Sequence, residues 1–165
     1  MGLWSRKVLL EAGQAAPVFK LKDTAGKLWA SSDLLADGPV LFALFKVSCP
    51  VCQLAMPYLE RLQQNASPTS LRVIGISQDR ADDTKYFNHE FGITFTTLLD
   101  TTEPNYPVSN AFGISTVPSL FLVEKDGSIS WSSVGFVKSE LESLGKRFGV
   151  VMFTQDDDVP AWKAG

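Results

Sequence analysis

An unbroken apolar run followed closely by two cysteines limits what this chain can fold into. Val40–Phe45 contains only apolar side chains, and Cys49 and Cys52 come directly after it, separated by Pro50-Val51. Such a run is typical of a central parallel strand that is covered on both faces. The sequence therefore predicts a buried strand that leads into a helix whose first turn holds both sulfur atoms.

The spacing of the two cysteines predicts thiol-disulfide chemistry. Cys49 would begin the helix, where free backbone N–H groups and the helix dipole favour a thiolate, which is the reactive species, over a thiol. Cys52, one turn later, could then release a mixed disulfide. Two other interpretations stay open: a pair of ordinary buried thiols, or half of a zinc site, which would need ligands from elsewhere because His89 is the only histidine.

Composition indicates one globular domain and excludes some partners. With 165 residues, 45% of them hydrophobic, the chain can bury a core without cross-links. A net charge of -3 gives no basic surface, so we expect no nucleic-acid partner. Residues 1–11 lack the apolar core of an export signal and no later stretch could span a bilayer, which predicts a cytoplasmic protein without membrane contact, although a mature periplasmic form would look the same.

Alternating strand and helix patterns predict an α/β sandwich with a mixed sheet. We expect strands at 17–22, 27–30, 40–46, 71–77, 96–99, 119–123 and 128–131, and helices at 32–35, 49–64, 82–91, 105–112 and 138–148. The turn at Asp23–Gly26 predicts an N-terminal hairpin. Residues 1–153 would form the domain, and the acidic segment 154–165 a mobile tail, unless Trp162 fixes it to the domain or docks a partner.

Several segments in this order resemble a known family. They are Gly13–Phe19, the join of the apolar run to Cys49-Pro50-Val51-Cys52, Met56–Glu60 and Phe112–Leu122. Together they look like the thioredoxin superfamily, and within it the TlpA/ResA-like branch of the AhpC/TSA (thiol-specific antioxidant) family, over residues 13 to 148. The resemblance implies a thioredoxin-like three-layer sandwich with a mixed central sheet, helices on both faces and an N-terminal β-hairpin.

The resemblance also implies roles for individual residues. Cys49 would be the attacking thiol and Cys52 the resolving thiol. Pro118 would be a cis-proline facing the disulfide, although without the resemblance an ordinary trans proline that opens a strand is the simpler interpretation. Val117 would pair with an extended substrate, and Thr116 would lie nearby.

Lys46 is a candidate modulator of the attacking thiol. It stands three residues before Cys49, at the end of the predicted strand. A cation there would favour the Cys49 thiolate if the side chain pointed toward it. A lysine at the end of a strand can equally extend into solvent.

The departures from the family pattern concern the exposure of the attacking sulfur and proton transfer. Ser48 stands where thioredoxins carry a tryptophan, which should leave the Cys49 sulfur more exposed and alter the docking surface. Ala43 replaces the buried aspartate of thioredoxins, and Ala55 replaces the glutamate of ResA-like proteins. The usual proton acceptors for the buried thiol are therefore missing. Water or another carboxylate would have to replace them, and Glu60 and Asp79 are the candidates.

The sequence thus predicts a thiol-disulfide oxidoreductase that needs no metal or organic cofactor. It would reduce protein or small-molecule disulfides and would be recycled by a thiol reductant or a thioredoxin-type partner. A peroxiredoxin-like peroxidase is one alternative, but Phe42 and Lys46 replace the proline and threonine of its P-x-x-x-T-x-x-C pattern. A copper-binding or chaperone-like module that uses Cys49, Cys52 and His89 is another.

Overall fold

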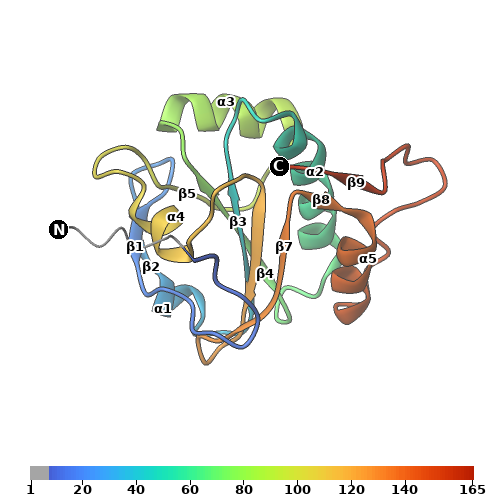
Figure 1. Cartoon of the computed structure of the whole chain (residues 1–165), viewed down its shortest axis with the longest axis horizontal. Helices are drawn as coiled ribbons and strands as arrows, with labels where there is room; N and C mark the ends of the chain where they lie inside the picture. Colours follow the sequence, from blue (N-terminus) through green and yellow to red (C-terminus); the bar gives the residue numbers. More distant parts are fainter. Residues whose placement is uncertain (1–7) are drawn as a thin grey trace.

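A five-stranded mixed sheet forms the centre of the computed structural model, which describes residues 8–165 (Figure 1). Its strands are β3 (Val40–Phe45), β4 (Arg72–Ser77), β5 (Thr97–Leu99), β6 (Ser119–Val123) and β7 (Ile129–Val134), in the order β5-β4-β3-β6-β7. β3 to β5 are parallel, β6 runs antiparallel to β3, and β7 runs antiparallel to β6. The central strand β3 is buried along its whole length, as the apolar run predicts.

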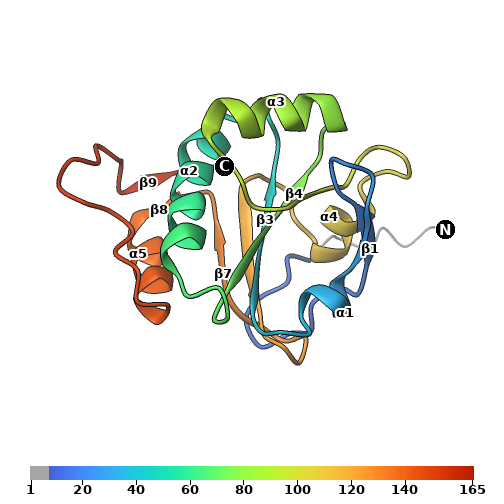
Figure 2. The same ribbon diagram turned by 180° about the vertical axis from the view of Figure 1, so that it is seen from behind.

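Helices cover both faces of this sheet, so the predicted three-layer sandwich is confirmed. One face packs against α2 (Pro50–Asn65), α3 (Ala81–Phe91) and α5 (Lys138–Arg147). The other packs against α1 (Ser31–Leu34), α4 (Pro107–Phe112) and the hairpin of β1 (Lys20–Lys22) and β2 (Leu28–Ala30). Figure 2 shows the same two groups from behind, with α2 and α5 on one side of the sheet and the hairpin on the other.

The side chains of β3 divide between two hydrophobic clusters because alternate residues of a strand point to opposite faces. Leu41, Ala43 and Phe45 pack in the cluster that contains α2 and α5. Val40, Phe42 and Leu44 pack in the cluster that contains α4 and the hairpin. Burial on both faces fixes the position of the strand end from which the cysteine segment begins.

The N-terminal hairpin is confirmed, and one carboxylate closes its turn. Asp23 accepts hydrogen bonds from the backbone N–H groups of Ala25 (2.8 Å) and Lys27 (2.9 Å) and from the indole of Trp29 (2.9 Å). β1 and β2 pair with each other in a separate two-stranded sheet beside the central one, and an isolated bridge between Asp23 and Leu98 links their turn to β5.

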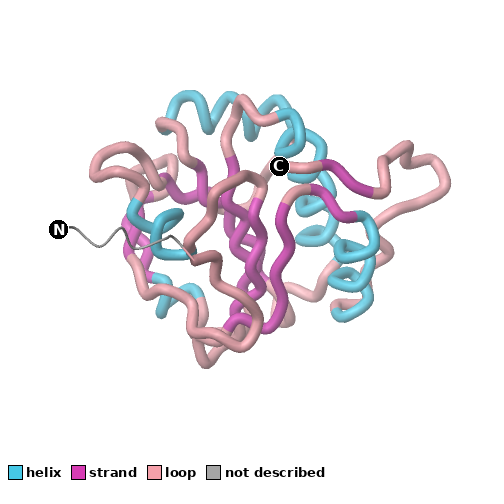
Figure 3. The backbone as a smooth tube through the Cα atoms, viewed as in Figure 1, coloured by secondary structure: helices cyan, strands magenta, loops and turns pink. Residues whose placement is uncertain are grey.

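The C-terminal segment follows the domain surface and ends in a strand that the sequence did not predict. β9 (Trp162–Lys163) pairs antiparallel with β8 (Phe136–Val137), after a long loop that leaves α5 and returns (Figure 3). The mobility expected for 154–165 stays a prediction, whereas the position of the segment is now defined.

Within residues 8–165, no helix combines the length and the apolar character needed to cross a bilayer. Residues 1–7, which belong to the stretch searched for an export signal and to the expected domain 1–153, lie outside the described residues.

Candidate redox site

Cys49 stands at the point where the buried strand β3 leads into α2. It is the N-cap of the helix, in extended conformation, and Pro50 occupies the first helical turn, where its missing N–H is not needed. The Cys49 sulfur accepts a hydrogen bond from the backbone N–H of Cys52 at 3.1 Å. The predicted join of strand and helix is therefore confirmed, with the sulfur at the positive end of the helix dipole.

The two thiols occupy different environments. Cys49 is half-buried, Cys52 is fully buried, and both are free. Burial raises the pKa of the Cys52 thiol far above its ordinary value, and a side-chain hydrogen bond with Cys49 acts in the same direction. Cys52 is consequently a neutral thiol at neutral pH, and Cys49 is the member of the pair that solvent can reach.

The loop before β6 lies against the Cys49 sulfur. The Val117–Pro118 peptide bond is cis, which confirms that part of the prediction. The Cys49 thiol is 3.5 Å from the Val117 carbonyl oxygen, to which it donates. The loop is held by hydrogen bonds from the Ser119 hydroxyl to the Thr116 carbonyl (2.8 Å) and from the Gly135 N–H to the Pro118 carbonyl (2.8 Å). Val117 thus contacts Cys49, while Thr116 is exposed one residue further away.

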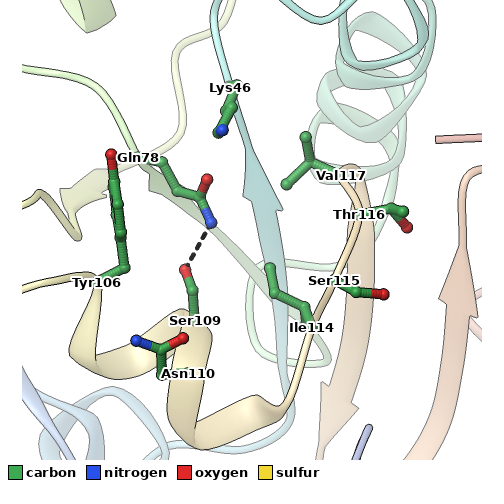
Figure 4. A pocket seen from close by; sticks show the side chains of 9 residues that line it. All are labelled: Lys46, Gln78, Tyr106, Ser109, Asn110, Ile114, Ser115, Thr116 and Val117. Atoms are coloured by element: carbon green, nitrogen blue, oxygen red, sulfur yellow. Dashed lines mark hydrogen bonds between the residues drawn. The ribbon is translucent and has the colours of Figure 1, made fainter. Parts of the chain in front are cut away.

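A cavity of about 210 Å³ opens on the other side of this loop. Figure 4 shows its lining: Lys46, Gln78, Tyr106, Ser109, Asn110, Ile114, Ser115, Thr116 and Val117. The Gln78 amide donates to the Ser109 hydroxyl at 2.9 Å across the cavity. The Lys46 side chain points into this space, and no ion pair joins it to another of the residues 8–165.

Sequence reasoning found Lys46 but missed the polar residues opposite it. Gln78 follows β4, Tyr106 precedes α4, and Ser109 lies within α4. No local motif joins these three positions, because only the packing of α4 beside the end of the sheet brings them together. A spacing pattern in the sequence could not have identified them.

The structure separates the two candidate proton acceptors. Asp79 accepts a hydrogen bond from the Val47 N–H at 2.8 Å, two residues before Cys49, and its charge is among the influences that raise the Cys52 pKa. Glu60 instead accepts hydrogen bonds from the N–H (2.6 Å) and the hydroxyl of Thr94, at the other end of α2. Asp79 is therefore the candidate that lies beside the cysteines.

A copper site formed by Cys49, Cys52 and His89 would require these three side chains to lie close together. Among the described residues, no group of three or more His, Cys, Asp or Glu side chains is close enough to hold a metal ion. His89 is exposed near the C-terminal end of α3, and it does not join Cys49 and Cys52.

The chain is 26% identical to the thiol-disulfide oxidoreductase ResA of Bacillus anthracis over 148 residues, which is 88% of this chain and 83% of the relative. The thioredoxin domain of a thiol-disulfide oxidoreductase from Bacteroides vulgatus superposes with a TM-score of 0.74 at 22% identity, over 84% of this chain and 98% of that one. Peroxidoxin BcpB of Mycobacterium tuberculosis superposes with a TM-score of 0.69 at 20% identity, over 85% of this chain and 95% of that one. These superpositions show a thioredoxin-like fold.

A family model gives the assignment directly. The model of the AhpC/TSA family matches residues 12–132, a stretch that runs from before the hairpin to within β7 and includes both cysteines and the cis-proline loop. The chain therefore belongs to the AhpC/TSA family.

Proposed function

We propose that this protein is a thiol-disulfide oxidoreductase in which Cys49 attacks and Cys52 resolves. The observation that carries the proposal is the asymmetry of the pair: Cys49 is accessible at a helix N-terminus, and Cys52 is a buried neutral thiol directly behind it. The ResA relatives, which are named thiol-disulfide oxidoreductases, support the same chemistry.

The reaction consists of two exchange steps. The Cys49 thiolate attacks one sulfur of the substrate disulfide, the S–S bond breaks, and the other sulfur leaves as a thiolate that takes up a proton. Cys52 then loses its proton and attacks the Cys49 sulfur, so that the second substrate sulfur leaves as a thiol. Two electrons and two protons pass to the substrate, and a Cys49–Cys52 disulfide remains for an external thiol reductant or thioredoxin-type partner to reduce.

The direction of electron flow in the proposal is reduction of the substrate. The substrates would be protein or small-molecule disulfides, held at the backbone of Val117 beside Pro118, with Thr116 at the rim. A reducing compartment such as the cytoplasm would return the pair to the dithiol form, and this location remains part of the proposal.

Asp79 is proposed as the group that takes the Cys52 proton. The second exchange step needs a base because the buried Cys52 thiol does not ionise readily at neutral pH. Ala43 and Ala55, which occupy the positions of the usual acids, are fully buried and carry no acceptor. The Asp79 carboxylate, fixed by the Val47 N–H, is the nearby acid that supports this role.

The two single-cysteine variants test the assignment of roles. Cys52→Ala keeps the attacking thiol, so it should accumulate a mixed disulfide with a small disulfide such as oxidised glutathione. Cys49→Ser keeps only the buried thiol and should accumulate far less. Intact-mass spectrometry after acid quenching measures the adduct. Equal labelling of both variants, or labelling of Cys49→Ser alone, would overturn the roles proposed for Cys49 and Cys52.

A further inference from the structure

The end of the described chain lies on the same carbonyl group that contacts the Cys49 thiol. A Cβ atom built on Gly165 would stand 2.4 Å from the Val117 carbonyl oxygen and 3.4 Å from the Thr116 hydroxyl oxygen. A separation of 2.4 Å is too short for two unbonded atoms, so the Gly165 backbone already packs closely against this oxygen. The Val117 carbonyl, to which Cys49 donates, is therefore covered on another side by residue 165.

The residues just before Gly165 continue this contact along the surface. A Cβ atom on Gly135 would lie 2.5 Å from the Lys163 carbonyl oxygen and 3.1 Å from the Gly165 nitrogen. The Gly135 N–H in turn donates to the Pro118 carbonyl. The segment Trp162–Gly165 thus runs across Gly135 and ends at the cis-proline loop, close to the first turn of α2 (Figure 1).

Two sets of contacts hold this segment in place. Close to the site, β9 pairs with β8, and the Lys138 N–H donates to the Ala161 carbonyl at 3.0 Å. Further back, Asp157 accepts hydrogen bonds from the Arg61 guanidinium (2.6 Å) and the Thr154 N–H (2.7 Å). The Arg61 hydrogen bond also lowers the pKa of Asp157, so this carboxylate stays ionised at a lower pH than an ordinary aspartate.

We propose that the segment Trp162–Gly165 occupies the substrate-docking edge, which is the backbone of Val117 beside Pro118. An extended disulfide substrate must displace this segment to reach Cys49. The inference rests on the proposed function, because it concerns the edge at which substrate is expected to bind. An extended peptide needs the backbone of Val117, whereas a small disulfide needs only the Cys49 sulfur. The segment therefore selects against extended substrates and leaves small ones largely unaffected.

Two changes should remove the obstruction. Gly165→Val places a side chain against the Val117 oxygen, and Gly165 has no positive φ that would strain the substitution. Removal of residues 162–165 deletes the segment. Each should raise kcat/KM for an extended peptide disulfide by about threefold or more, because the apparent affinity rises with the fraction of molecules whose site is open. Ala164→Val, which places the same valine side chain at an exposed neighbouring position, is the matched control.

The measurement compares two substrates in each variant: an extended peptide with one mixed disulfide, and hydroxyethyl disulfide. The expected result is faster reduction of the peptide in Gly165→Val and in the shortened chain, with hydroxyethyl disulfide reduced as in the unchanged protein. Unchanged peptide rates, or peptide rates that fall when the segment is removed, would overturn the inference. If the unchanged protein reduces neither substrate, the proposed function itself fails.

Discussion

The buried thiol of Cys52 should make the stability of the reduced protein depend on alkaline pH. Its pKa in the folded state is raised above the unperturbed value of 9.0, mainly by burial. The contribution of this raised pKa to the free energy of unfolding is therefore fully present below pH 9. It is lost as the pH rises, because the Cys52 thiol then ionises in the unfolded state. Cys52→Ala, which removes the thiol, should remove this part of the pH dependence.

The size of the effect follows from the linkage relation. Each pH unit above the unfolded pKa changes the free energy of unfolding by about 1.4 kcal/mol for one group that ionises only in the unfolded state. Between pH 7 and about pH 10.5, the reduced protein should therefore lose about 2 kcal/mol more stability than Cys52→Ala loses. Other titrating groups are common to both proteins, so they cancel in this difference.

Urea unfolding followed by far-ultraviolet circular dichroism, with a phosphine reductant at each pH, gives the required free energies. Cys49→Ser serves as the matched control, because it keeps the buried Cys52 thiol and should retain most of the slope. Parallel pH profiles for the unchanged protein and Cys52→Ala would refute the reasoning, since they would mean that Cys52 ionises equally easily in the folded state.

Three further predictions concern other residues of the site and core. Asp79→Asn should slow the decay of the mixed disulfide by at least about tenfold at neutral pH, and the decay rate should recover at higher pH. Stopped-flow measures this rate, and an unchanged rate would exclude Asp79 as the proton acceptor. Lys46→Ala should raise KM for an anionic disulfide such as oxidised glutathione, because it removes a positive charge from the cavity. The expected rise is only about two- to fivefold, since exposed charge pairs are weak, and KM for hydroxyethyl disulfide should stay unchanged. Equal effects on both substrates would exclude a charge contact in the cavity. Leu59→Ala, in the buried face of α2, should cost about 2–5 kcal/mol of unfolding free energy, whereas Val18→Ala at an exposed position should cost under about 0.5 kcal/mol.

The elements around Cys49 could be predicted because local patterns specify them. The apolar run has the pattern of a strand buried on both faces, and the two cysteines follow it at the spacing of one helical turn. Both features depend on neighbouring residues alone. The structure places β3 at Val40–Phe45 and α2 at Pro50–Asn65, close to the predicted bounds.

The cis geometry at Pro118 came from the family resemblance, because no residue beside a proline dictates the isomer. Most X-Pro bonds in folded proteins are trans. A second cis bond, Glu103–Pro104, was not predicted, since the chain offers no family motif there.

Features that depend on distant segments could not be predicted. The two strands β8 and β9 have only two residues each, too short for any periodicity, and their pairing joins positions more than twenty residues apart. The choice of Asp79 over Glu60 depends on tertiary contacts: Asp79 accepts a hydrogen bond from Val47, close to Cys49, whereas Glu60 binds Thr94. Sequence reasoning could name both acids but had no means to place either one beside Cys52.

Equilibration of the protein with glutathione buffers, followed by quantitative thiol trapping, tests the central claim most directly. The account predicts that the Cys49 and Cys52 thiols disappear together in one two-electron transition, with a potential near the thioredoxin value of about -270 mV. A potential near about -120 mV would contradict the proposed direction of electron flow. Failure of Cys49 and Cys52 to form an intramolecular disulfide at any potential would contradict the account as a whole.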